Sequence, residues 1–385
     1  MRRLMRPAMV MAVIAFGTRV DPVLGIAVAV AVWGATSWIV PFRTVEGVEG
    51  WRHLPSRALF GEEVEATLEI HASSRVPWLA VTDTHPFDFG ESRRWVTTLA
   101  AGQTRTHTVV FRAAKRGLHR IGPAVAVGGD AFGARTVQRT VVPASTILVY
   151  PRIVPLETVE LAAGAPLPLI PTRVPLYEDP TRVVGVREYR AGDPMRRVHW
   201  SATAASGVLQ VKQLRHAVAR DVVVLVDLGK DSHPSPGRRR SAELAVTVGA
   251  SLVDHLVVQR AEAAGLRILA HDTPTGRSSV TAVSPGRDQA RLARMLEHLA
   301  RSDLTDLEGL DSLFQPATLP FGSSVVLVTG RADRRHVLGV MGLRKLGMSV
   351  TVVLTASEFH RDDGGLERLG VPVRHVGRLA EMVGL

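Results

Sequence analysis

The sequence contains no cysteine, which excludes disulfide bonds, thiolate metal sites and cysteine nucleophiles. Lysine is also scarce: it occurs only at Lys115, Lys212, Lys230 and Lys345, so the formal charge of +11 comes mainly from arginine. An arginine-rich surface suits anionic lipid head groups or acidic partners. Aromatic residues are few, the basic residues are scattered between acidic ones, and no groove-reading motif occurs. We therefore expect no nucleic-acid partner.

The motifs of common enzyme sites are also missing. No glycine-rich phosphate loop, no paired nucleophile and base, and no closed metal motif can be found in the 385 residues. We therefore predict that the protein is not an enzyme. The length exceeds what a single hydrophobic core usually organises, and it predicts several domains.

Two uncharged apolar runs, 7–18 and 23–40, lie near the N-terminus. At about 1.5 Å per residue the second run covers roughly 27 Å, close to the thickness of the hydrocarbon core of a bilayer. Arginines lie before the first run and after the second, at Arg2, Arg3, Arg6, Arg43, Arg52 and Arg57. The positive-inside rule then places both flanks in the cytoplasm, so residues 1–42 are predicted to form a transmembrane helical hairpin. A single span and a cleaved signal peptide are the alternatives.

Residues 43–150 have the pattern of β-strands. Val64, Ala66, Leu68 and Ile70 alternate with polar residues, as in a strand that is buried on one face. Further β-branched runs follow between glycine and proline turns, at Trp78–Thr82, Thr106–Phe111, Ala124–Val127, Thr136–Val142 and Thr146–Val149. This spacing predicts an antiparallel β-sandwich.

Prolines recur through 151–182, which predicts an extended linker rather than a helix. In the last region, 216–385, apolar strand patterns alternate with helical ones. The expected strands are Asp221–Leu228, Leu266–His271, Ser324–Thr329, Ser349–Leu354 and Val371–Val376, and the expected helices are Arg240–Ala264, Gln289–Arg301, Asp333–Leu346 and a last one from Arg378. This alternation predicts a mostly parallel sheet with helices on both faces.

The segment 183–215 between the linker and the α/β region concentrates charged and aromatic residues in a short stretch. We expect Asp193 and Pro194 to start a helix, because Asp accepts hydrogen bonds from free amides and Pro fixes the first helical φ. The segment is interpreted either as a polar clasp between the two soluble domains or as a docking surface for a protein partner. Its candidate residues are Arg187, Glu188, Tyr189, Gly192, Asp193, Arg196, Arg197, His199 and Trp200.

This segment, with its R-E-Y-R-x-G-D-x-x-R-R-x-H-W order, resembles the signature of the domain-of-unknown-function 58 family of bacterial membrane proteins. The stretches at 115–123, 129–134 and 148–152 are similar to further motifs of that family. The resemblance implies a multi-pass protein of the bacterial inner membrane with cytoplasmic soluble domains, a von Willebrand factor A-like (Rossmann-like) α/β domain and association with a MoxR-type AAA+ ATPase. Ser201 and Ala205 stand where the family commonly has a basic residue and an arginine.

The resemblance also implies a place for a divalent cation, because von Willebrand factor A-like domains usually carry D-x-S-x-S after the first strand. Here the corresponding residues 227–231 keep only the leading aspartate, and glycine and aspartate replace the two serines. Mg²⁺ needs several oxygen ligands, so we expect no cofactor. If Mg²⁺ binds, the candidate ligands are Asp227, Asp231, Thr329 and Asp333. Asp231 and His233 lack metal or triad spacing and are expected to be solvated.

The sequence therefore favours a membrane-anchored cytoplasmic scaffold or adaptor that recruits a protein partner. The partners expected are the lipid bilayer and a protein, and the candidate protein is a MoxR-type AAA+ ATPase. One alternative is a divalent-metal-dependent binding domain at Asp227. A second alternative is a hydrolase that uses His199 or Asp227.

Overall fold

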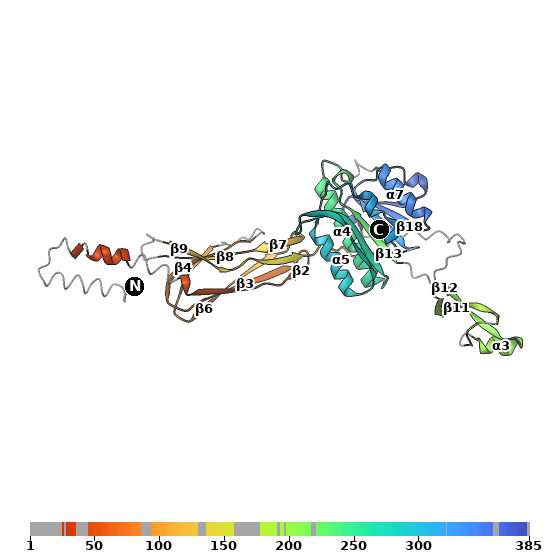
Figure 1. The fold of residues 1–385 in the computed structure, drawn as a ribbon, viewed down its shortest axis with the longest axis horizontal. Coiled ribbons are helices and arrows are strands. Elements are labelled where there is room, and N and C mark those ends of the chain that lie inside the picture. The colour runs from red at the N-terminus through yellow and green to blue at the C-terminus, as the bar shows by residue number, and fades with distance from the viewer. Residues whose placement is uncertain are drawn as a thin grey trace. The chain divides into compact units, whose positions relative to one another are not determined.

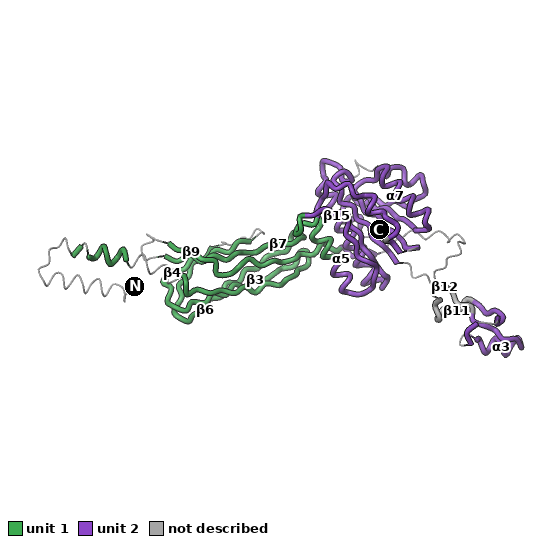
Figure 2. The backbone as a smooth tube through the Cα atoms, viewed as in Figure 1, with its two compact units in different colours: residues 1–153, 272–276, 296–302 green, residues 154–271, 277–295, 303–385 purple. Residues whose placement is uncertain are grey.

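The structure, a computed structural model, shows two compact units (Figures 1 and 2). Unit 1 comprises residues 1–153, 272–276 and 296–302, and unit 2 comprises the remainder. The described residues are 25–26, 28–35, 45–85, 94–129, 136–157, 178–190, 193–195, 198–216, 221–320, 322–356 and 362–382.

Most of the predicted membrane hairpin lies outside the described residues. The described part, 25–26 and 28–35, is helical and carries exposed apolar side chains such as Ile26 and Trp33. Among described residues, one helical stretch is long and apolar enough to cross a membrane, Arg238–Gln259, and 83% of its most apolar window is buried inside the protein. That stretch is therefore explained by the core of unit 2.

Unit 1 is built from three β-sheets of sandwich-like character. The sheet orders are β1-β3-β6, β5-β4-β8-β9 and β2-β10-β7, and every pairing is antiparallel except β2 with β10. The strands are β1 (Val48–His53), β2 (Arg57–Ala58), β3 (Glu63–Ala72), β4 (Val76–Asp83), β5 (Arg94–Leu99), β6 (Gln103–Arg112), β7 (Gly117–Ile121), β8 (Ala124–Gly129), β9 (Thr136–Val142) and β10 (Ser145–Val149).

The alternation in β3 explains how this strand contributes to two apolar clusters of unit 1. Its apolar residues are buried as predicted: Leu68 and Ile70 belong to one apolar cluster, and Val64 and Ala66 to another. Strands β1, β5 and β7 were not among the predicted runs, because their sequences mix arginine and other polar residues with apolar ones. Pairing with neighbouring strands, rather than local preference, makes these segments extended.

Unit 2 contains a mixed sheet with the order β15-β14-β13-β17-β18-β19. The pairs β14–β13, β13–β17, β17–β18 and β18–β19 are parallel, as predicted. Their bounds are β13 (Val222–Asp227), β14 (Ala264–Asp272), β15 (Arg277–Gly286), β17 (Ser324–Thr329), β18 (Ser349–Leu354) and β19 (Val373–His375), and the two-residue β16 (Ser302–Asp303) pairs with β14. All residues of β13 and β17 are buried, which is typical of central parallel strands.

Helices cover both faces of this sheet. Helix α4 (Arg238–Asp254) packs on β13 and β17, while α7 (Arg334–Lys345) packs on β18 and α6 (Leu310–Leu313) on β13 and α7. α5 (Gln289–Arg301) has the predicted bounds. The predicted helix 240–264 is wrong at its C-terminal end, because a π-helical turn ends it at Gln259 and β14 begins at Ala264. The last predicted helix is a 3-10 turn, Leu379–Met382.

Strands β11 (Glu178–Glu188) and β12 (Gln210–His216) form an antiparallel hairpin with the short helix α3 (Trp200–Ser206) between them. We call the described residues of 178–216 the signature hairpin. β11 begins before Val183, inside the segment predicted as linker. Residues 151–157 have no regular structure, and 158–177 lie outside the described residues.

Candidate functional site

The C-terminal edge of the parallel sheet brings together residues that are far apart in the sequence. Asp227 is the last residue of β13 and Thr329 the last of β17, and these two strands are paired in parallel. The chain leaves β13 towards β14 on one side and later returns to β17 on the other. This is the topological switch point at which open α/β sheets bind ligands.

The Asp227 carboxylate is fully buried, and the protein itself satisfies both of its oxygens. Oδ1 accepts the Gly229 amide at 2.8 Å. Oδ2 lies 3.1 Å from the Thr329 hydroxyl, which donates to it, and 3.0 Å from Nε2 of His336. Burial alone would raise the pKa of Asp227, but the hydrogen bond and the charge of His336, followed by hydrogen bonds from Ser232 and Gly229, hold it below its usual value. The carboxylate is therefore ionised at neutral pH.

His336 links this carboxylate to a second one. Asp333 is the N-cap of α7, and its Oδ1 accepts the amides of Arg335 and His336 and lies 2.7 Å from Nδ1 of His336. Burial lowers the pKa of His336, but the hydrogen bonds and charges of Asp227 and Asp333 outweigh it and raise the pKa above the usual value. We call Asp227, Thr329, Asp333 and His336 the edge cluster.

A second histidine, His233, supports the same edge in a different way. It is fully buried, so the prediction of a solvated residue is wrong for His233. Its Nε2 lies 2.9 Å from the backbone oxygen of Asp227 and its Nδ1 lies 2.8 Å from the Ser241 hydroxyl. Burial lowers the pKa of His233, so the ring is neutral at neutral pH. His233 thus orients the strand end without contributing a charge.

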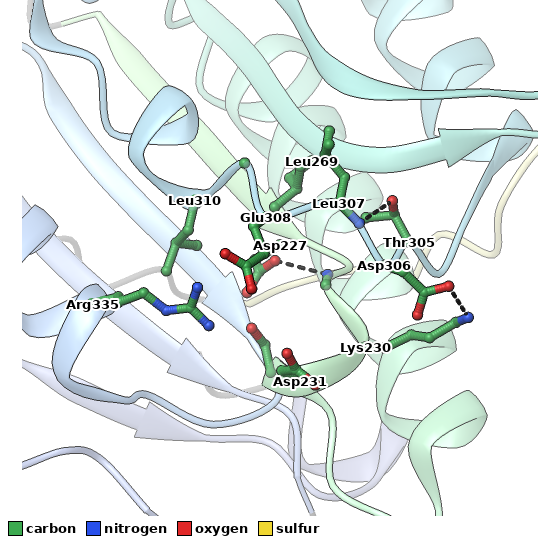
Figure 3. A pocket seen from close by; sticks show the side chains of 13 residues that line it. Asp227, Lys230, Asp231, Leu269, Thr305, Asp306, Leu307, Glu308, Leu310 and Arg335 are labelled. Carbon is green, nitrogen blue, oxygen red and sulfur yellow. Dashed lines mark hydrogen bonds and ion pairs between the residues drawn. The ribbon is translucent and has the colours of Figure 1, made fainter.

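A shallow polar pocket lies beside the edge cluster (Figure 3). Arg335 lies on one side of it, and Lys230, paired with Asp306, lies on the other. Asp231 and Glu308 also line this pocket. Its cavity volume of about 60 Å³ is several times smaller than the roughly 300–1,000 Å³ of sites for small organic ligands. The pocket can therefore take water or the tip of one side chain, but not a larger molecule.

The four candidate metal ligands are only partly brought together. Asp227 and Thr329 are in contact, and Asp333 reaches Asp227 only through the ring of His336. Asp231 lines the pocket. Its backbone oxygen accepts a hydrogen bond from Nε of Arg331. No group of three or more acidic, histidine or cysteine residues suited to a metal ion occurs in the described part of the chain. Both carboxylate oxygens of Asp227, the atoms that would bind a metal ion, are thus already hydrogen-bonded within the protein.

The signature hairpin holds the second group of predicted site residues. Arg187 makes a bidentate ion pair with Asp193, with both N–O distances 2.7 Å, and Asp193 also accepts the Arg190 amide at 2.9 Å. These contacts lower the pKa of Asp193 to about 2, with the hydrogen bond from Arg187 as the largest cause. Two of the predicted residues are thus paired within the hairpin itself, and Gly192, Arg196 and Arg197 lie outside the described part.

The predicted helix start at Asp193 is wrong. Helix α3 begins at Trp200, and its N-cap is His199, whose Nδ1 accepts the Ala202 amide. Asp193 cannot cap a helix ahead of it, because its carboxylate reaches back to Arg187 and Arg190. The Ser201 hydroxyl lies 2.9 Å from the same Nδ1, so a hydroxyl does lie next to His199, contrary to expectation.

The hairpin exposes several large apolar side chains. Val198 and Val211 are buried, whereas Trp200 is 66% exposed and several neighbours are also open to solvent: Val186, Met195, Val208 and Leu209. Tyr189 continues the strand pairing through its amide, which donates to Leu209, and Glu188 pairs with Gln210 in the register. Exposed apolar side chains that lie together are typical of interaction surfaces.

Comparison with known proteins places both groups in one family region. Residues 185–358 match the family described as "Protein of unknown function DUF58". The DUF58 match includes most of the signature hairpin and the whole edge cluster. No curated protein matches the chain.

Solved structures resemble the chain only weakly. A CARDB domain from Pyrococcus furiosus, solved with di-metal ions, is 12% identical and covers 26% of this chain and 91% of its own, with a TM-score of 0.21. The pilus adhesin RrgA from Streptococcus pneumoniae is 11% identical and covers 73% of this chain and 41% of its own, with a TM-score of 0.20.

Proposed function

We propose that this protein is a membrane-anchored cytoplasmic scaffold of the bacterial inner membrane that recruits a protein partner through its signature hairpin. The exposed apolar side chains of the hairpin are the observation on which this proposal depends. Trp200, Met195 and Val208 are each at least half exposed. A two-stranded hairpin is marginally stable by itself, and a partner that covers these side chains would stabilise it. Tryptophan is one of the side chains enriched at the energetic centre of protein interfaces.

The membrane anchor of the proposal is the two-helix hairpin over residues 1–42. The apolar runs 7–18 and 23–40 support it, together with the arginines on both flanks. The described helical residues 28–35 expose apolar side chains such as Val30 and Trp33, as a lipid-facing helix would.

The partner that we propose is a MoxR-type AAA+ ATPase. This choice rests on the family resemblance, and the DUF58 match over residues 185–358 supports it. The von Willebrand factor A-like character of unit 2 is part of the same proposal. It is supported by the strand order β15-β14-β13-β17-β18-β19, in which a central parallel strand ends in Asp227 at the switch point.

The two alternatives receive less support. A divalent-metal-dependent binding domain needs open oxygen ligands at Asp227, and those oxygens already accept Gly229, Thr329 and His336. A hydrolase could use Ser201 with His199, but the same His199 nitrogen caps helix α3. No third group orients that ring among the hydrogen bonds of the described residues, so the contact is better explained by local capping.

The proposal is tested with the full chain in detergent micelles and a purified MoxR-type ATPase from the same genome. We expect saturable binding that Trp200→Ala weakens about tenfold or more, the loss of roughly 1.4 kcal/mol or more typical of an interface tryptophan. The matched control is Trp51→Ala, because Trp51 is also exposed but lies in unit 1. Absence of binding to the unmodified chain contradicts the partner, and equal weakening by both variants contradicts the surface.

The anchor is tested separately in spheroplasts. Protease added outside should leave the C-terminal half intact if the soluble domains are cytoplasmic. Digestion of that half, or a mature chain that is freely soluble, would contradict the membrane part of the proposal.

A further inference from the structure

Two arginines are fixed to the turn that follows β13. Arg331 donates from its amide to the backbone oxygen of Ser232 at 2.8 Å, and from its Nε to that of Asp231 at 3.1 Å. Arg238, the first residue of α4, donates from its Nε to the backbone oxygen of His233 at 3.1 Å. Three consecutive carbonyl groups of one short turn thus hold both side chains. We call Arg238 and Arg331 the arginine pair.

The turn itself is held in place from two sides. The loop after β17 packs directly against it, because a side chain at Gly330 would collide with the backbone oxygen of Ser232. His233 is fully buried and forms hydrogen bonds through both ring nitrogens. An arginine that donates through Nε to a fixed acceptor keeps its two terminal nitrogens side by side. The pair is therefore oriented before any ligand binds, which lowers the cost of binding.

The terminal nitrogens of the arginine pair are open to a ligand. Among the described residues, no ion pair and no hydrogen bond uses the Nη groups of either arginine. Arg331 is exposed and Arg238 is half-buried, so both remain within reach of solvent. Two parallel N–H groups of a guanidinium match the two oxygens of a carboxylate, and such bidentate contacts are among the strong hydrogen bonds of proteins.

The neighbouring carboxylates indicate what kind of anion fits. Asp231, in the same turn, lines the pocket of Figure 3, together with Asp306 and Glu308. Asp231 is exposed, and the side chain of Asp306 is 78% exposed. A surface of anionic lipids carries negative charge throughout and would be repelled by these carboxylates. An acidic peptide segment instead brings single carboxylates to the arginines and leaves its uncharged residues beside the acidic ones.

We infer that the arginine pair binds an acidic peptide segment of a protein partner, at the C-terminal edge of the parallel sheet. This goes beyond the proposed function, which places docking on the signature hairpin, because it adds a second contact surface with a different chemistry. The hairpin offers exposed apolar side chains, whereas this edge offers fixed cations for carboxylates.

The test uses the full chain in detergent micelles and, as probe, a fluorescent peptide of alternating glutamate and serine. Fluorescence anisotropy should show saturable binding. Arg331→Gln and Arg238→Gln should each weaken it about tenfold, because each removes charge-assisted hydrogen bonds. The matched control is Arg344→Gln, since Arg344 is also exposed and donates to a backbone oxygen, that of Leu369, but lies at the C-terminal end of α7.

Three outcomes of this titration overturn the inference. They are no binding by the unmodified chain, equal weakening by Arg344→Gln and the two variants of the pair, and equal binding of a peptide that has glutamine in place of glutamate.

Chemical modification locates the contact in the unmodified chain, which covers the case that a variant fails to fold. Phenylglyoxal reacts with accessible arginines, and mass spectrometry of the digested protein reads each position. The glutamate peptide should slow the reaction of Arg238 and Arg331 several-fold and leave that of Arg344 unchanged. Protection of the pair by nanodiscs of anionic lipid without peptide, or by inorganic phosphate alone, would assign it to another ligand and overturn the inference.

Trp200→Ala separates this inference from the proposed function. The variant should bind the glutamate peptide as tightly as the unmodified chain, because Trp200 lies in the signature hairpin and not at the sheet edge. Failure of the ATPase to bind counts against the proposed function alone. Loss of peptide binding in Trp200→Ala overturns the inference.

Discussion

Replacing His336 with alanine is expected to destabilise unit 2 by about 3–5 kcal/mol. The substitution leaves the Asp227 carboxylate without a counter-charge in a fully buried position. Breaking a buried ion pair by removing one partner typically has this effect, because the remaining charge stays desolvated. The Gly229 amide and the Thr329 hydroxyl still donate to Asp227, so the loss should not exceed that range.

Thermal unfolding of the full chain, followed by circular dichroism, measures the effect. For a domain of this size about 1 kcal/mol shifts the melting temperature by roughly 2–4 °C, so we expect the transition of unit 2 to fall by roughly 6–20 °C. The matched control is His271→Ala, since His271 lies in the same sheet and its hydrogen bond to Ser278 is exposed. Exposed substitutions of this kind usually change stability by less than about 0.5 kcal/mol.

A double-mutant cycle separates the ion pair from the loss of ring volume. Asp227→Ala, His336→Ala and the double variant should give a coupling energy of about 1–3 kcal/mol, because the second substitution no longer breaks a pair. Additive losses, or equal melting temperatures for His336→Ala and His271→Ala, would refute the reasoning.

Three further predictions concern pH, unit 1 and the signature hairpin. The raised pKa of His336 adds stability that is complete below about pH 6.5 and is lost as the pH rises through the pKa of the folded state. The lowered pKa of Asp227 adds stability that is complete above about pH 3.8 and is lost on acidification. Melting temperatures measured across pH should therefore show the largest contribution of this pair between these two pH values. In unit 1, Arg52→Met should lower stability by about 3–5 kcal/mol in urea titrations, because the buried Arg52 pairs with Asp83 at 2.6 Å; a change below about 1 kcal/mol would contradict a structural role for this pair. In the hairpin, Arg187→Lys should weaken partner binding less than Arg187→Ala but not match the native chain, since lysine keeps the charge and loses the bidentate geometry; equal binding by all three would show that the ion pair has no role in docking.

Most elements of unit 2 could be predicted from local patterns. The strands Ser324–Thr329 and Ser349–Leu354 have the predicted bounds, because runs of buried β-branched residues admit few other structures. The sandwich strands with clear alternation, such as β3, were also predictable. Strand β15 was missed, since its Arg277–Gly286 sequence is mostly exposed and lacks a repeating apolar pattern.

The candidate site was predictable only in part. Asp227 and Thr329 could be placed at one edge, because the carboxyl ends of neighbouring parallel strands meet there. His336 was missed, although it stands three residues after the N-cap Asp333, a spacing typical of a capping box and thus a usable signal. The prediction at Asp193 was wrong for another reason: the helix-start rule assigned its carboxylate to the amides that follow, whereas it pairs with Arg187, six residues earlier.

The sequence by itself determined most strands and helices of unit 2, the two N-terminal apolar runs and the position of Asp227 and Thr329 at one sheet edge, because these depend on periodicity and composition along the chain. Only the tertiary structure decided that the ring of His336 lies beside Asp227, since the contact joins residues 109 positions apart and depends on where α7 starts relative to β13. It likewise decided that His233 is buried and that Trp200 is exposed, because burial is a property of packed neighbours and not of local sequence.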